Sequence, residues 1–79
     1  MIVVKILGSG CANCKRLEQI VRQIVEKENM EAEILKVTDF DEIMKYPILA
    51  TPGLVINEKL ISAGRVPSSA EVLEWLKTA

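Results

Sequence analysis

The pattern of hydrophobic and polar residues changes its period several times along the chain, and each change marks the edge of an expected element. Short runs rich in β-branched and other apolar residues predict strands over residues 2–7, 33–37, 53–56 and 59–63. Apolar residues that recur every three or four positions predict a helix over residues 12–28, a short helix from about residue 39 and a last helix from about residue 68.

The expected helix over residues 12–28 has one apolar face, which predicts that it packs against a sheet or another helix. That face carries Cys14, Leu17, Ile20, Val21, Ile24 and Val25. The second helix must be short, because Pro47 soon follows its apolar residues Phe40, Ile43 and Met44.

Capping and turn residues locate the ends of the later elements. Ser68 and Glu71 have the spacing of a capping box at the start of the last helix, and Asp39 opens the short helix in a similar way. Only Asn57 and Glu58 separate the last two strands, so we expect a tight antiparallel hairpin. Asn57 can adopt the positive φ of such turns, whereas Glu58 fits them less well.

Lys5 is an unusual residue for the first strand, because a central strand covered on both faces should be apolar. We expect its stem to lie along the sheet while its amine reaches the edge. The element order is β-α-β-α-β-β-α, which predicts an α/β fold with a four-stranded mixed sheet flanked by three helices. With 79 residues, the chain is expected to form a single domain over residues 1–79.

Composition narrows the possible functions. The net charge of −1 gives no basic excess of the kind that nucleic-acid-binding domains carry, so no nucleic-acid partner is expected. The absence of histidine excludes catalysis that depends on an imidazole base. The apolar run over residues 2–7 is too short to span a bilayer and lacks the features of a signal peptide, so we expect no membrane association and a cytoplasmic protein.

The two cysteines, Cys11 and Cys14, form a C-x-x-C pair where the first strand's loop meets the following helix. A helix N-terminus stabilises an anion, which favours the thiolate form of Cys11. Cys14 lies on the apolar face of the helix and is expected to be buried. One exposed and one sheltered thiol suit thiol–disulfide exchange, with Cys11 as the nucleophile and Cys14 as the resolving cysteine.

Other uses of the pair remain open. A purely structural disulfide would close only a short loop, which stabilises a fold by only about 2 kcal/mol. A structural zinc site needs four ligands, which this chain could supply only as a dimer. A soft-metal carrier of the Cu(I) type needs only two thiolates and is the main rival. A redox-regulated binding module without turnover is the third hypothesis.

The sequence around these cysteines resembles the small thioredoxin/glutaredoxin-like redox-active disulfide proteins of archaea and bacteria. The resemblance rests on the segments 8–14 (Gly-Ser-Gly-Cys-Ala-Asn-Cys), 51–57 (Thr-Pro-Gly-Leu-Val-Ile-Asn) and 64–67 (Gly-Arg-Val-Pro), together with Tyr46. It covers nearly the whole chain and implies a minimal thioredoxin fold. It also implies a cytosolic thiol-disulfide oxidoreductase that acts through a Cys11/Cys14 dithiol-disulfide cycle.

The resemblance further implies a cis Thr51–Pro52 bond beside the cysteines. The backbone of Thr51 would then pair with an extended substrate near Cys11, as an added strand does. Thr51 and Pro52, with Gly10 and Gly64 keeping the surroundings open, are therefore the expected substrate-binding residues. The chain is expected to be a monomer with no metal and no cofactor beyond its redox-active disulfide. Its expected partners are disulfide-containing proteins or small disulfides.

Two departures from the larger families limit what can be inferred. Thioredoxins proper carry a buried aspartate in the strand before the cysteines, whereas residues 2–7 hold no carboxylate. No proton acceptor for Cys14 can therefore be named from the sequence. Glutaredoxins usually show Thr-Val-Pro where this chain has Ala50-Thr51-Pro52, so the electron donor stays open between a flavin-dependent reductase and glutathione or another small thiol.

Overall fold

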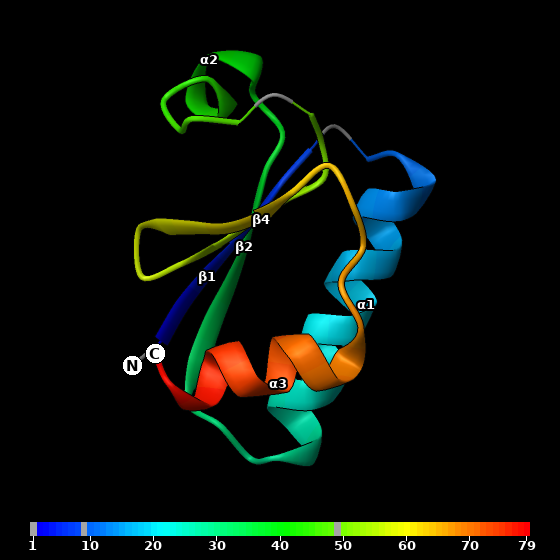
Figure 1. The fold of residues 1–79 in the computed structure, drawn as a ribbon, viewed down its shortest axis with the longest axis vertical. Helices are drawn as coiled ribbons and strands as arrows, with labels where there is room; N and C mark the ends of the chain where they lie inside the picture. Colours follow the sequence, from blue (N-terminus) through cyan, green and yellow to red (C-terminus); the bar gives the residue numbers. More distant parts are fainter. Residues whose placement is uncertain (1, 9, 49) are drawn as a thin grey trace.

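The strands assemble into one mixed sheet with the order β2-β1-β3-β4 (Figure 1). The computed structural model describes residues 2–8, 10–48 and 50–79. Its strands are β1 (Ile2–Leu7), β2 (Ala32–Val37), β3 (Gly53–Ile56) and β4 (Lys59–Ala63). Its helices are α1 (Ala12–Lys27), α2 (Phe40–Ile43) and α3 (Ser69–Lys77). The predicted α/β fold and its element order are confirmed, and the predicted bounds of β2 and α1 each differ by one residue.

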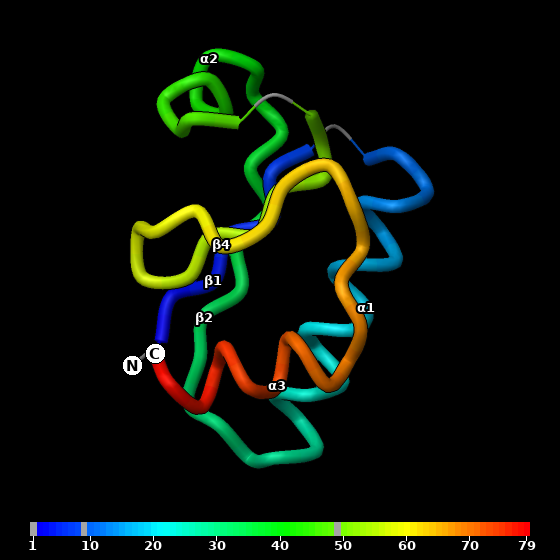
Figure 2. The backbone as a smooth tube through the Cα atoms, in the orientation of Figure 1, coloured from blue at the N-terminus to red at the C-terminus, as the bar shows by residue number. Residues whose placement is uncertain are grey.

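Strand β1 lies at the centre of the sheet, because it pairs with β2 in parallel and with β3 in antiparallel orientation. The parallel pair needs a crossover, which α1 provides, and the antiparallel pair β3–β4 needs only a two-residue turn. Figure 2 follows this path and shows α2 near the end of the sheet where β1 and β2 finish, far from α3.

The larger part of the core lies between the sheet and the pair of helices α1 and α3. Alternate residues of β1 and β3 point to this side, and the apolar face predicted for α1 packs on them. The buried residues of this cluster are Val4, Ile6, Leu17, Val21, Ile24, Leu54, Ile56, Val72 and Leu76. Because α1 and α3 cover this face together, it is the well-packed side of the molecule.

The other face of the sheet carries a smaller cluster of Leu7, Ile43, Ile48 and Val55. Helix α2 is only four residues long and covers just one end of this face. The expected apolar stripe of α2 is therefore only partly buried. Ile43 is 5% exposed, whereas Met44, which ends the helix, and Phe40 are 56% and 70% exposed.

The two capping motifs differ. Ser68 and Glu71 form the predicted reciprocal capping box at the start of α3. The box-like opening expected at Asp39 is not a box, because the Asp39 side chain accepts from the N–H of Asp41 and the Glu42 carboxylate pairs with Lys45. The pairing of Glu42 with Lys45 takes the place of the bond from Glu42 back to the N-cap.

The hairpin turn and Lys5 form one polar network. Asn57 and Glu58 both have positive φ, 50° and 69°, as a two-residue hairpin of type I′ requires. The Glu58 carboxylate accepts from Lys5 Nζ at 2.5 Å and from the Tyr46 hydroxyl at 3.3 Å. The hydrogen bond to Glu58 raises the pKa of Lys5 to about 12. These bonds hold Glu58 in a conformation that non-glycine residues rarely adopt.

The helix cap of α3 makes the stability of the fold sensitive to acid. The hydrogen bond from Arg65, followed by that from the Ser68 backbone, lowers the pKa of Glu71 from its ordinary value of 4.5 to about 2. A carboxyl with a depressed pKa in the folded state stabilises it above the unfolded pKa and loses this effect as the pH falls. Replacement of Glu71 by Gln should therefore lower the free energy of unfolding at pH 7, with the difference from wild type shrinking between pH 4.5 and about 2.

Urea unfolding at a series of pH values measures this difference. Glu74→Gln, which removes an exposed carboxylate from the same helix, is the control and should show little pH-dependent change. A difference between wild type and Glu71→Gln that stays constant down to pH 2 would contradict the assignment.

Candidate active site

Cys11 is the N-cap residue of α1. The backbone N–H of Cys14 donates to Cys11 Sγ, with 3.1 Å between nitrogen and sulfur. The sulfur therefore occupies the end of the helix where unpaired N–H groups and the helix dipole favour negative charge. A thiolate of Cys11 at this position is stabilised by the same N–H group.

The two sulfurs form a disulfide bond and differ in their exposure. Cys11 is exposed, whereas Cys14 is 5% exposed and lies in line with the buried residue Leu17. The apolar face of the helix predicted this difference, because Cys14, the third residue after Cys11, is already turned toward the sheet. Lys15 and Arg16 follow on the exposed side of the helix.

Gly8 is the residue at which the cysteines and the proline segment meet. A Cβ at Gly8 would overlap Cys14 Sγ and would lie 3.8 Å from Thr51 Cβ. The N–H of Gly8 donates to Val37 at 2.9 Å, so the residue continues the pairing of β1 with β2. Any larger side chain would separate the strand end from α1. Ser9, which the sequence also placed in this loop, lies outside the described residues.

The segment around Pro52 forms the neighbouring wall of the site. The Thr51–Pro52 peptide bond is cis, with Thr51 exposed and Pro52 buried. The Gly64 N–H donates to the Pro52 carbonyl at 2.9 Å, and a Cβ at Gly64 would lie 3.3 Å from Ala50 Cβ. Gly64 therefore belongs to the same wall as Thr51 and Pro52, although it follows β4 in the chain.

Gly10 lies on the open side of the cysteines. It is exposed, its φ is +85°, and a Cβ there would meet no atom within 4 Å. The structure thus brings Cys11, Cys14, Thr51, Pro52 and Gly64 to one end of the sheet, with Gly10 at its solvent edge.

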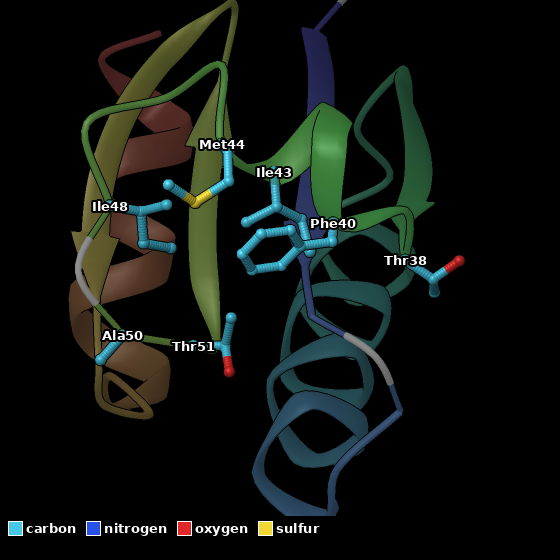
Figure 3. A pocket seen from close by; sticks show the side chains of 7 residues that line it. All are labelled: Thr38, Phe40, Ile43, Met44, Ile48, Ala50 and Thr51. Carbon is cyan, nitrogen blue, oxygen red and sulfur yellow. The ribbon is translucent and has the colours of Figure 1, made fainter.

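An apolar groove of about 450 Å³ begins at Thr51 and runs under α2. Figure 3 shows Phe40, Met44 and Ile48 pointing toward a common space, with Thr51 at its lower edge. The groove exists because α2 is too short to cover this face of the sheet completely. It offers exposed apolar surface directly beside the proline segment.

Within the described residues, no group of three or more His, Cys, Asp or Glu side chains is placed to hold a metal ion. None of the helices in residues 2–8, 10–48 and 50–79 has the length and apolar content required to cross a bilayer.

Comparison with known proteins agrees with this geometry. The sequence model of the Thioredoxin domain family matches residues 2–77. The chain belongs to the thioredoxin family. A thioredoxin of Methanocaldococcus jannaschii is 37% identical over 78 residues, which are 99% of this chain and 90% of that protein. A thioredoxin of Methanothermobacter thermautotrophicus is 38% identical over 76 residues, which are 96% of this chain and 99% of that protein.

Solved thioredoxin structures share the fold at much lower identity. The germline thioredoxin Deadhead of Drosophila melanogaster superposes with a TM-score of 0.69 at 18% identity, over 98% of this chain and 79% of that one. A thioredoxin-2 of the malaria parasite gives a TM-score of 0.73 at 16% identity, over 100% of this chain and 84% of that one. Family membership makes the protein a thiol-disulfide oxidoreductase, whose partners in general are disulfide-containing proteins and a reductase.

Two features of the site were not predicted from the sequence. Gly8 was assigned only to a loop, although a glycine that directly follows a strand and precedes C-x-x-C is a signal of close approach. The groove was missed because Phe40 and Met44 have the spacing of core residues, and spacing alone does not show how much of a sheet a short helix covers.

The contact between Gly8 and Cys14 can be tested by double substitution. Gly8→Ala should lower the free energy of unfolding of the reduced protein by about 1–3 kcal/mol, because the new methyl group overlaps the Cys14 sulfur. In a Cys14→Ala background, which lacks that sulfur, the same substitution should cost clearly less. Equal costs in the two backgrounds, measured by denaturant unfolding, would contradict this contact.

Proposed function

We propose that the protein is a cytosolic reductase of disulfides in proteins or small molecules, with Cys11 as the nucleophile and Cys14 as the resolving cysteine. The observation that carries the proposal is the bond from the Cys14 N–H to the exposed Cys11 sulfur at the start of α1. That bond favours the thiolate of the one sulfur that a substrate can reach.

The reaction consists of two exchanges. The Cys11 thiolate attacks one sulfur of the substrate disulfide, and the other substrate sulfur leaves as a thiolate and takes up a proton. Cys14 then loses its proton and attacks Cys11 Sγ. The Cys11–Cys14 disulfide forms, and the second substrate sulfur leaves. The substrate has gained two electrons, which the protein has lost.

The substrate is held by the wall of Thr51, Pro52 and Gly64, with Gly10 leaving the approach to Cys11 open. An extended segment of the substrate pairs with the exposed backbone at Thr51, as in strand addition. An apolar side chain of the same segment enters the groove under α2, since Thr51 lines that groove as well. The groove thereby selects disulfides that lie beside an apolar residue.

The partners and location of the protein belong to the same proposal. A flavin-dependent reductase or a low-molecular-weight thiol such as glutathione returns the two electrons. The protein works as a monomer in the cytoplasm, where thiols are kept reduced, and it has no membrane or nucleic-acid partner. The disulfide itself is the redox group, and no metal or further cofactor is needed for the exchange. Stoichiometric Cu(I) binding that survives a competing chelator would favour the soft-metal carrier instead.

The roles of the two cysteines predict different behaviour of two matched variants. In insulin reduction with dithiothreitol, Cys11→Ser should abolish the acceleration seen with wild type, because the exposed nucleophile is gone. Cys14→Ser should form the mixed disulfide with substrate but release product slowly, so the adduct should accumulate in mass spectra. A wild-type rate no higher than that of Cys11→Ser, without a reversible internal disulfide, would contradict the proposal.

The groove predicts a selective loss of affinity. Replacing both Phe40 and Met44 by Ser should raise KM for a protein disulfide about tenfold, because roughly one apolar contact worth 1.4 kcal/mol is lost. The rate with a small aromatic disulfide reagent should stay unchanged. Ile61→Ser removes an exposed apolar residue that does not line the groove and should affect neither substrate. Equal changes with both substrates would argue against a docking role.

A further inference from the structure

A small cavity of about 70 Å³ adjoins Cys14 and shares only Thr38 with the apolar groove. The charged residues that line it are Lys15 and Glu18 on α1 and Lys36 on β2, while the adjoining parts of β1 and its loop, Ile6 and Gly8, contribute no charge. The buried residue Cys14 is thus bordered by charged residues as well as by apolar ones.

Glu18 is the carboxylate of this cavity. It follows Cys14 by four residues, so the two side chains lie on the same face of α1 in successive turns. Its side chain is only 16% exposed. Its two oxygens have different partners, since Oε2 accepts from Arg22 Nε at 2.8 Å and Oε1 lies 3.6 Å from Lys36 Nζ. The carboxylate is therefore fixed in place from both sides.

We propose that Glu18 accepts, through water in this cavity, the proton that Cys14 loses when it attacks the mixed disulfide. The inference rests on the proposed function. It names an acceptor for the Cys14 proton, which β1 cannot supply because residues 2–7 contain no carboxylate. The acceptor is supplied instead by α1, one helical turn beyond the resolving cysteine.

The cavity has the size and lining that the proton transfer needs. A water molecule takes up about 30 Å³ in the liquid and is retained where several polar groups surround it. The cavity is larger than one water molecule, and Cys14, Glu18 and two lysines are among the residues that line it. Water can thus connect the Cys14 thiol with Glu18 without direct contact between the two.

The charges around Glu18 keep it in the accepting form. The hydrogen bond from Arg22, together with the charge of Lys36, lowers the pKa of the Glu18 carboxyl, so the group is ionised at neutral pH. Lys15 and Lys36 stabilise negative charge that develops on Cys14, while Glu18 opposes it.

The step is balanced in atoms and electrons. The Cys14 S–H proton passes through water to Glu18, and the sulfur electron pair forms the bond to Cys11 Sγ. The bond between Cys11 Sγ and the substrate sulfur breaks, and the substrate leaves as a thiolate. Glu18 then returns its proton to solvent, which its partial exposure permits.

A thiol titration tests whether Glu18 and Lys36 lie close to Cys14, and it does not require the protein to turn over a substrate. In a Cys11→Ser protein, ultraviolet absorbance against pH reports the thiolate of Cys14 alone. Adding Glu18→Gln should move this transition to lower pH by about one pH unit, and adding Lys36→Gln should move it to higher pH. Glu26→Gln, which removes an exposed carboxylate from the same helix, should leave it in place. A transition that does not respond to Glu18 would overturn the proposal.

A kinetic measurement tests the proton transfer itself. The mixed disulfide with substrate is formed on wild type and on Glu18→Gln, and the release of substrate is followed by rapid quench at several pH values. Release from Glu18→Gln should be about 100-fold slower at pH 7 and should rise more steeply with pH, because hydroxide must replace the lost acceptor. Glu18→Asp should recover most of the wild-type rate.

The outcomes separate this proposal from the proposed function. If wild type reduces disulfides and Glu18→Gln shows the same rate and pH profile, the proton-accepting role is wrong and the reductase stands. If wild type forms no mixed disulfide at all, the proposed function fails, while the titration still reports whether Glu18 faces Cys14. A uniform slowing with an unchanged pH profile in both Glu18 variants would indicate a structural effect and overturn the inference.

Discussion

The close approach of three chain segments at Gly8 is the constraint on which the site depends. The end of β1, the first turn of α1 and the Thr51–Pro52 segment come within a distance that leaves no room for a side chain at that position. The Cys14 sulfur is buried because the helix starts this near to the sheet. The exposed sulfur remains on the solvent side, since it caps the helix rather than entering it.

The two faces of the sheet are covered unequally, so one side is well packed and the other carries an open groove. Helices α1 and α3 bury the larger cluster, which supplies most of the apolar burial in this short chain. Helix α2 is too short to do the same on the other face, so Phe40 and Met44 stay exposed beside the catalytic end. The protein thus obtains a groove without a separate domain, because part of one core is left open.

Local sequence signals predicted the helices and strands well, because each of these signals depends on interactions between residues that are close in sequence. The β-branched runs, the apolar face from Cys14 to Val25 and the Ser68 cap each act within a few residues, and the structure contains all of them. The features that the sequence did not predict depend on contacts between segments that are distant in sequence. The conformation of Glu58 is supported by Lys5, which lies 53 residues earlier, and Glu18 meets Lys36 across the cavity only once β2 has paired with β1. The periodicity of apolar residues along the chain carries no information about such side-chain pairs.

The network of Lys5, Tyr46 and Glu58 has a consequence for how this sequence can vary. Lys5 lies in the central strand with its side chain 23% exposed, and its charge is matched by a residue in the hairpin turn. Loss of Glu58 would leave a half-buried ammonium with only a hydroxyl as partner, and loss of Lys5 would leave Glu58 at positive φ without its main bond. An apolar residue in the strand and a glycine in the turn would together resolve both problems. The two positions are therefore coupled, and a change at one is tolerated best when the other changes with it.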